Sequence, residues 1–502
     1  MSATLLLTII FAYFLLLLFV SWKTSKGSNN ESFFIGNRSS NWMLVAFGMI
    51  GTSLSGVTFV SVPGAVGHDA FGYLQITLGY VIGYVIIAFV LLPLYYRLKL
   101  TSIYGYLQSR MGMAAYKTGS LFFIVSRWVG ATARLYLVVN ILQMVILDRL
   151  GVPFSVTTLV ILVMIILYTY EGGVKTIVWT DTLQTTCMLA GLLICSIYML
   201  YHMNMNITDS LTAMHDQGLS RVFGLDFNDK NYFVKQILAG AFITITMTGI
   251  DQEMMQKSIS VSNLKDSQKN MISLAFILLI VITLFLYMGG LIHLYGAREH
   301  LSAQGDLLFP TIALEHMPTA IGIIFLIALI SALFPSADGA MTALTSSICI
   351  DILGMKRQDK WDESRQKAIR KKVHLWVAFS FLVLVLVFKI VNDNSMIGII
   401  LKMATYTYGP LLGLFAFGIF TKRKVQDRYV PYICFAAPLL CLLIDYFQAD
   451  LFGSFQIGLE LIIINGLFTW LGLWICSRPA TTEQWAAINL SAPAMDLLRK
   501  NK

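Results

Sequence analysis

Long apolar segments alternate with short charged loops along the whole chain, and this pattern constrains the fold more than any other feature. Hydrophobic residues make up 57% of the chain and charged residues only 13%, whereas about a quarter of a typical soluble domain is charged. A helix needs about 20 apolar residues to cross a bilayer. Thirteen such segments are predicted, near residues 3–21, 42–62, 71–96, 118–147, 153–170, 178–203, 231–256, 270–296, 318–353, 373–391, 395–421, 429–447 and 455–476. The chain is therefore predicted to be an all-α polytopic membrane protein.

Lysine and arginine are distributed unevenly between alternate loops. One set of loops, with the C-terminal tail, holds 27 of these residues, and the other set holds 4. Cytoplasmic loops carry the excess of positive charge, so the first set is predicted to be cytoplasmic and the N-terminus to lie outside. The positive net charge is then explained by membrane topology, so no nucleic-acid partner is expected. A multi-pass protein of the plasma (inner) membrane is predicted.

Two of the predicted spans have sequences that make poor continuous helices. Residues 42–62 contain three glycines and, close to them, the hydroxyl residues Thr52, Ser53, Ser55 and Thr58, and residues 231–256 combine glycines with threonines before Asp251. Glycine weakens a helix and hydroxyls compete for its hydrogen bonds. Unwound backbone at membrane depth is tolerated where it lines a cavity; close packing through small residues is the alternative explanation. Broken helices at corresponding places in two halves of a chain indicate a transporter binding site.

Asp338 lies in the middle of the apolar segment 318–353. A charged side chain at the bilayer centre costs about 2.5–3.5 kcal/mol on insertion scales, so this carboxylate is expected to face a cation. A buried pair with Arg127, Arg134 or Lys402 is the structural alternative. A buried carboxylate also binds a proton readily, which leaves proton coupling open.

Five segments, in this order along the chain, resemble the sodium/solute symporter family, which includes sodium-coupled sugar, proline, sialic acid and iodide carriers. They are residues 52–59 running into Pro63 and Gly64, residues 172–184, 248–257 and 331–351, and residues 409–415. The resemblance implies an inverted five-plus-five repeat of leucine-transporter type that works by alternating access.

A single membrane transport domain is accordingly predicted over residues 1–502. Its parts are an extra N-terminal helix at 1–22, a first five-helix repeat at 42–203, a second at 231–421, two additional helices at 429–476 and a cytoplasmic tail at 477–502.

The resemblance implies a principal sodium site between the broken first span of the core and the eighth. By motif position, its ligands would be the carbonyl oxygens of Gly51, Leu54 and Ala332 and the hydroxyl of Ser336. This chain departs from the family at Pro335, which lacks a hydroxyl that the family usually supplies.

A second ion position is implied next to the first. The family often has serine at the position of Asp338, and in some members this position forms a second sodium site with the aspartate that corresponds to Asp181. Two carboxylates would then frame one cation here. Asp181 also has a structural explanation, because it lies near the predicted cytoplasmic end of its span and would face the headgroups.

Motif position also implies which residues face the solute. They are Ser53, Ser55, Thr58, Thr77, Thr244, Met247, Thr248 and Lys402. Arg127 and Arg134 are seven residues apart, on one face of a predicted helix. One interpretation is that these arginines and Lys402 line a site for an anion, since the planar arginine fork matches a carboxylate. The alternative is that each pairs with a buried acidic residue.

These observations predict a sodium-coupled symporter that imports a small polar solute, an organic anion or a sugar, with the sodium ion as the coupling ion. A proton-coupled symporter on the same scaffold is the alternative. An enzyme is not expected, because the chain has no metalloprotease motif, P-loop or nucleophile elbow. The predicted partners are the solute, sodium and the lipid bilayer, with no obligatory protein partner.

Overall fold

A computed structural model describes residues 3–26, 29–170, 173–355, 361–391 and 396–480. Most of these residues are helical, and the only sheet among them pairs β1 (Arg423–Val425) antiparallel with β2 (Ser477–Pro479). The predicted tail lies largely outside this part of the chain, because residues 481–502 are not described.

The first half of the chain carries the extra helix and the first predicted repeat. Its elements are α1 (Ala3–Thr24), α2 (Asn30–Ile35), η1 (Gly36–Arg38), α3 (Trp42–Ser53), α4 (Gly56–Asp69), α5 (Tyr73–Ile86), η2 (Ile87–Leu91), α6 (Leu92–Arg97), α7 (Gly105–Arg110), α8 (Met113–Leu142), η3 (Gln143–Leu147), η4 (Asp148–Leu150), α9 (Phe154–Thr169), α10 (Val174–His202) and α11 (Ile207–Asp216).

The second half repeats the alternation of long and broken helices. Its elements are α12 (Phe233–Thr244), η5 (Ile245–Gly249), α13 (Gln252–Ser258), α14 (Leu264–Arg298), η6 (Gly305–Leu307), α15 (Leu308–Thr311), η7 (Ile312–His316), α16 (Thr319–Ser347), η8 (Ile348–Ile352), α17 (Glu363–Val391), α18 (Met396–Thr407), α19 (Gly409–Phe420), η10 (Asp427–Tyr429), α20 (Val430–Tyr446), α21 (Gln448–Phe452) and α22 (Leu461–Ile475).

The apolar helices have the length that a membrane requires. Within the described residues, 8 are long and apolar enough to cross a bilayer, or up to 11 if each bent pair is counted as one span, and α9 and α22 are shorter apolar helices. Large apolar side chains point outward from several of these helices, with Phe11 61%, Trp376 70% and Leu439 61% exposed. Such surfaces match a lipid environment. The number of thirteen spans and the outward N-terminus stay predictions.

The first predicted break is present in the structure. Helices α3 and α4 form one apolar unit bent by 57°. Leu54 leaves the helical region with φ −96° and ψ 75°, and Ser55 is extended before α4 begins. The carbonyl of Ile50 still accepts from the N–H of Leu54 at 2.8 Å, whereas the carbonyls that follow it in α3 have no later N–H of the same helix to accept from.

The second predicted break is present as well. The helix that ends at Gly249 and helix α13 meet at 70°. Asp251 starts α13 by accepting hydrogen bonds from the backbone N–H groups of Glu253 and Met254, which is the standard role of an N-capping aspartate.

A third bend of 42° separates Ile400–Thr407 from α19, whereas the sequence pattern predicts residues 395–421 as one continuous span. Pro410 opens α19 at its first turn. Proline has no N–H and restricts the residue before it, so the sequence pair Gly409-Pro410 was the available signal.

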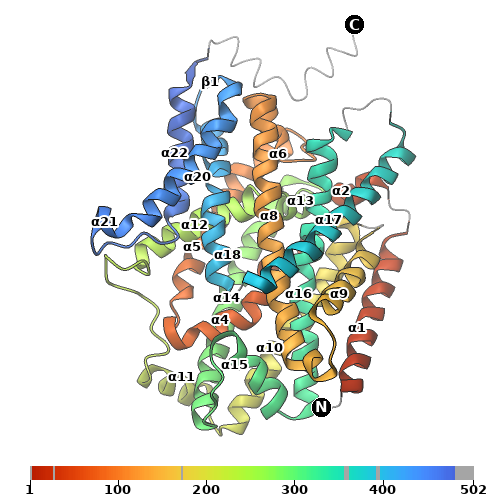
Figure 1. Ribbon diagram of the computed structural model, residues 1–502, viewed down its shortest axis with the longest axis vertical. Coiled ribbons are helices and arrows are strands. Elements are labelled where there is room, and N and C mark those ends of the chain that lie inside the picture. Colours follow the sequence, from red (N-terminus) through yellow and green to blue (C-terminus); the bar gives the residue numbers. More distant parts are fainter. Residues whose placement is uncertain (1–2, 27–28, 171–172, 356–360, 392–395, 481–502) are drawn as a thin grey trace.

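Helices α5 and α12 make the most extensive contact between the two halves. A Cβ atom on Gly79 would collide with the carbonyl of Ile237, and one on Gly240 with the carbonyl of Ile76. Small residues bring backbones together in this way in membrane bundles. Figure 1 shows α1 along one edge of the bundle and α20 with α22 along the other, so the predicted additional helices flank the core.

Candidate functional site

A cavity of about 110 Å³ lies at the breaks of the two interrupted spans. Polar and aromatic side chains make up much of its wall. The lining residues are Thr52, Ser53, Leu54, Ser55, Val57, Thr58, Tyr73, Tyr80, Tyr84, Arg127, Arg134, Ile243, Thr244, Met247, Thr248, Met254, Leu278, Ile282, Ile400 and Leu401. The cavity thus combines hydroxyl groups, three tyrosines and two arginines inside an apolar bundle.

Most of the predicted solute-facing residues meet in this cavity. Ser53, Ser55 and Thr58 line it from the break between α3 and α4, and Thr244, Met247 and Thr248 line it from the end of α12 and from η5. The two broken spans therefore bring residues about 190 positions apart into one wall. Hydroxyls at these places can donate to or accept from a polar solute.

Two of the predicted solute-facing residues are not among the described residues that line the cavity. Thr77 is buried and donates its hydroxyl to the carbonyl of Tyr73, 3.0 Å away on its own helix. Lys402 has a side chain that is 60% exposed, and its Nζ lies 2.8 Å from Oδ2 of Asp445 on α20. The structure therefore corrects the prediction for Lys402, because α18 turns this residue away from the cavity.

The two arginines on α8 differ in what they contact. Arg127 is buried, and its Nε donates to Oε2 of Glu253 at 2.6 Å. Its Nη1 lies 3.7 Å from Oδ2 of Asp251. Arg134 lines the same cavity and has neither a hydrogen bond nor an ion pair with any residue of the described chain. The charge of Arg127 is thus already balanced, whereas that of Arg134 faces the cavity.

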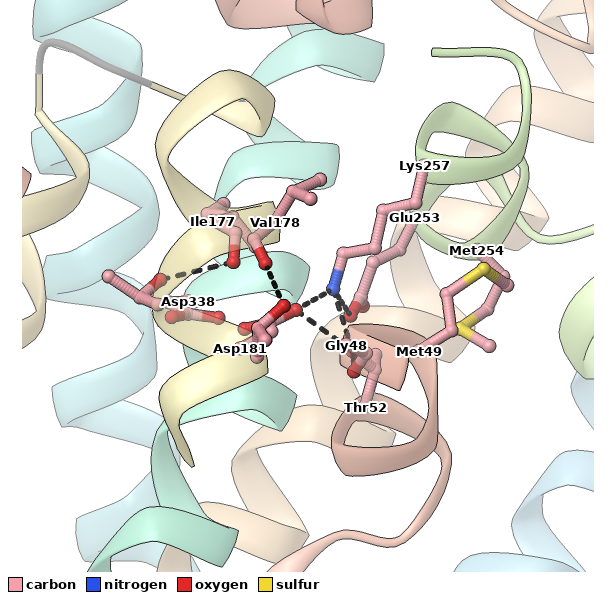
Figure 2. A network of polar contacts seen from close by, with 12 residues as sticks. Gly48, Met49, Thr52, Ile177, Val178, Asp181, Glu253, Met254, Lys257 and Asp338 are labelled. Carbon is pink, nitrogen blue, oxygen red and sulfur yellow. Dashed lines mark hydrogen bonds and ion pairs between the residues drawn. The ribbon is translucent and has the colours of Figure 1, made fainter. Parts of the chain in front are cut away.

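A second polar region lies where α3, α10, α13 and α16 meet (Figure 2). Asp181 on α10 is fully buried. Its Oδ2 accepts from Nζ of Lys257 at 2.7 Å and from Oγ1 of Thr52 at 3.2 Å. This position contradicts the explanation in which Asp181 faces the headgroups, because the side chain points into the bundle.

Asp338 is fully buried on α16, and Figure 2 shows it beside Asp181. Its Oδ2 accepts from the hydroxyl of Tyr168 at 2.7 Å, and its Oδ1 has no hydrogen-bond partner among the described residues. The predicted alternative, a pair with Arg127, Arg134 or Lys402, is not what the structure shows. A carboxylate oxygen without a partner at this depth is a place where a cation would bind.

Further buried polar atoms lack partners on the facing helices α10 and α16. In the described part of the chain they include Oδ1 of Asp181, both terminal atoms of Gln184, Oγ1 of Thr185 and Oγ1 of Thr342. Buried polar groups are rarely left unpaired. An oxygen-rich region with spare acceptors suits a hard cation.

The remaining predicted sodium ligands lie next to this region. Gly51 belongs to the last turn of α3 and Leu54 to the break itself. A Cβ atom on Gly51 would meet Thr185 on α10 and would lie 3.6 Å from Cγ of Pro335 on α16. Ala332 and Ser336 are buried on the same helix, and the Ser336 hydroxyl donates to the carbonyl of Leu333 at 3.0 Å. These positions lie on α3, α10 and α16, which contact one another; the ligand set itself stays a prediction.

Sequence reasoning missed three residues of this region. Lys257 was counted among the loop charges, although it is buried in the bundle. Glu253 and Tyr168 are absent from the predicted ion site. Lys257 and Glu253 lie in the segment 248–257, whose family resemblance was the signal that would have identified them.

Known proteins resemble this chain along most of its length. The family model described as "Sodium:solute symporter family" matches residues 33–427. The sodium/sialic acid symporter SiaT of Proteus mirabilis is 23% identical over 92% of this chain and 94% of its own. The sodium/sialic acid symporter NanT of Aliivibrio fischeri is 22% identical over 88% of each chain.

The fold also matches a solved structure. A Na+-coupled sialic acid symporter in a substrate-bound outward-open state superposes with a TM-score of 0.80, over 95% of this chain and 99% of that one, at 18% identity. At this identity the match establishes the fold. It confirms the predicted all-α polytopic architecture with a core of leucine-transporter type.

Proposed function

The chain belongs to the sodium:solute symporter family, and from this premise we propose that it imports a small organic anion together with sodium. Sodium-coupled symport of a small polar solute follows from the family and its sodium-coupled relatives. The nature of the solute is our proposal. We further propose the plasma (inner) membrane as its location, because inward sodium coupling requires the gradient across that membrane.

The proposed substrate class rests on the environment of Arg134. Arg134 belongs to the cavity wall, and its guanidinium group is not paired with any acidic group in the described chain. An unpaired charge inside an apolar bundle is costly, and a carboxylate on the solute would neutralise it in a bidentate geometry. The hydroxyls of Ser53, Ser55, Thr58, Thr244 and Thr248 would then bind the polar remainder of the solute.

The names of two relatives point the same way. The proteins from Proteus mirabilis and Aliivibrio fischeri carry sialic acid, whose carboxylate is ionised at neutral pH. A neutral sugar would use the hydroxyl-rich wall equally well, but it would leave Arg134 without a counter-charge. An organic anion therefore explains both the hydroxyl groups and the unpaired arginine of the cavity wall, whereas a neutral sugar explains only the hydroxyl groups.

For the coupling ion, we propose a site formed by α3 and α16 with α10 alongside. The carbonyls of Gly51 and Leu54 would supply neutral oxygens, as helix-break carbonyls do in transporters of this type, and the carbonyl of Ala332 would supply one from within α16. Ser336 and Asp338 would add a hydroxyl and a charge, and Asp338 compensates for the oxygen that Pro335 lacks. Oδ1 of Asp338, which is buried and without a partner among the described residues, supports this assignment.

Coupling follows from the shared break. Leu54 is a proposed sodium ligand and also lines the solute cavity, so sodium bound at the break would order the wall to which the solute binds. Each sodium ion that moves inward gains about 2.3 kcal/mol per 100 mV of negative-inside potential. Sodium binding from outside, solute binding and inward opening would then form one alternating-access cycle.

The test is uptake of radiolabelled sialic acid into proteoliposomes that contain the purified protein. We expect an inward sodium gradient to drive accumulation and other carboxylates to compete, while neutral sugars do not. Uptake of neutral sugars without uptake of anions would refute the proposed substrate class. Uptake that follows an imposed proton gradient and is indifferent to sodium would support the proton-coupled alternative.

A further inference from the structure

Lys257 places a positive charge inside the proposed ion-binding region. It lies at the end of α13 and is 2% exposed. Its Nζ lies 2.7 Å from Oδ2 of Asp181, 2.7 Å from Oγ1 of Thr52 and 3.9 Å from Oε1 of Glu253. Helices α10, α3 and α13 thus each contribute one oxygen to a single ammonium group, as they would to a bound metal cation (Figure 2).

The helix α16 leaves room for this ammonium group. Gly339 follows Asp338, and a Cβ atom at Gly339 would lie 3.2 Å from Nζ of Lys257 and would collide with Oε1 of Glu253. The absence of a side chain at this one position therefore lets Lys257 and Glu253 pack against α16. Any larger residue would push the ammonium group away from Asp181.

The ion pairs in this region leave one carboxylate without a cationic partner. Glu253 and Asp251 both contact Arg127, and Asp181 contacts Lys257. Asp338 contacts a tyrosine hydroxyl and, within the described residues, no cationic side chain. Asp338 is therefore the carboxylate of this region that has no cationic contact among the described residues, whereas Asp181 already has one in Lys257.

We propose that Lys257 is a built-in cation that occupies the place of a second sodium ion at Asp181 and so limits this symporter to one bound sodium ion. The proposal rests on the proposed function, because it assumes that sodium binds beside Asp338. Lys257 acts as a residue that determines ion stoichiometry. A mobile ion beside Asp181 would meet the ammonium group about 2.7 Å from the same oxygen, and like charges at that distance repel strongly in a buried site.

Removal of the ammonium group should open the second ion position. In Lys257→Met, Oδ2 of Asp181 and Oγ1 of Thr52 lose their cation and become free to bind sodium. Lys257→Arg is the matched control, since it keeps the positive charge. Lys257→Gln is a second neutral variant that still donates a hydrogen bond, which guards against misfolding of the methionine variant.

The experiment counts sodium ions with ²²Na+ as the probe, by equilibrium binding to the purified full-length protein. We expect one ion per wild-type molecule, one per Lys257→Arg molecule and two per molecule of a folded neutral variant. Two ions bound to the wild type would overturn the inference while leaving the proposed function intact, and so would one ion in a folded neutral variant. No sodium binding to the folded wild type would instead refute the proposed sodium coupling. If neither neutral variant folds, the number of sodium ions bound by the wild type tests the inference: one ion is expected, and two ions would refute it.

Discussion

Tyr168 on α9 donates its hydroxyl hydrogen to Oδ2 of Asp338 on α16, at 2.7 Å. This is the only hydrogen bond that the described residues provide to the Asp338 carboxylate. Helix α9 therefore fixes the orientation of the carboxylate, and this orientation leaves Oδ1 available. The proposed sodium site thus depends on a helix that contributes no ligand to it.

Tyr168→Phe removes this hydrogen bond and changes little else in the shape of the side chain. A hydrogen bond to a charged group contributes about 1.5–3 kcal/mol. We expect the apparent melting temperature in detergent to fall and the sodium concentration for half-maximal uptake to rise. Sodium activation identical to that of the wild type would show that Tyr168 does not position Asp338.

Arg134→Gln removes the charge that we assign to the solute carboxylate. Loss of an interaction worth about 1.5–3 kcal/mol corresponds to an increase in KM of about ten- to hundredfold. Lys402→Gln is the comparison, because Lys402 is largely exposed and bound to Asp445; its KM should stay within about twofold of the wild type. The measurement is initial-rate uptake of labelled sialic acid over a range of concentrations. Equal effects of the two substitutions would contradict the placement of the solute at Arg134.

The sequence was sufficient to predict features that arise locally. The apolar spans follow from runs of hydrophobic residues, and the first two breaks follow from glycine and hydroxyl residues inside such runs. Both breaks are present, with bends of 57° and 70°. Ser53 and Thr248 could be predicted as solute-facing residues because the helix breaks in which they lie form part of the cavity wall.

Pairings across the bundle could not be predicted in the same way. Tyr168 and Asp338 are 170 positions apart, and nothing in either segment indicates that they meet. Lys257 appeared to be a loop charge because no local signal shows that α13 returns into the bundle. Lys402 was predicted to face the solute by motif position. The structure instead pairs it with Asp445 on α20, a helix outside the predicted repeats, and the face that α18 turns toward α20 depends on packing.

Asp338→Asn tests whether the carboxylate binds the coupling ion. The amide keeps the shape of the side chain and can still accept from Tyr168, but it carries no charge. We expect the sodium concentration for half-maximal uptake to rise about tenfold, which corresponds to a loss of about 1.4 kcal/mol. In sodium-free buffer the variant should be at least as stable as the wild type. The wild type then buries the Asp338 charge without a cation, which is costly, and the variant does not.

The matched control for this substitution is Asp445→Asn. Asp445 is also a carboxylate on a membrane helix, but it contacts the exposed Lys402 and Tyr406. We expect its sodium activation to match that of the wild type. If Asp338→Asn and Asp445→Asn show the same sodium activation, Asp338 is not part of the ion site.

Gly339→Ala tests the packing that admits Lys257 to the ion-binding region. The added methyl group would collide with Oε1 of Glu253 and crowd Nζ of Lys257, and overpacking of this kind costs about 1–3 kcal/mol. Gly130→Ala on α8 is the matched control, since a Cβ atom there meets no atom within 4 Å and alanine favours a helix by about 0.5–1 kcal/mol. Thermal unfolding in the same detergent should therefore show a lower melting temperature for Gly339→Ala and an equal or higher one for Gly130→Ala. If the two variants behave alike, the contact between α16 and Lys257 is looser than the structure shows, and the ammonium group would not be held at Asp181 by the shape of this helix.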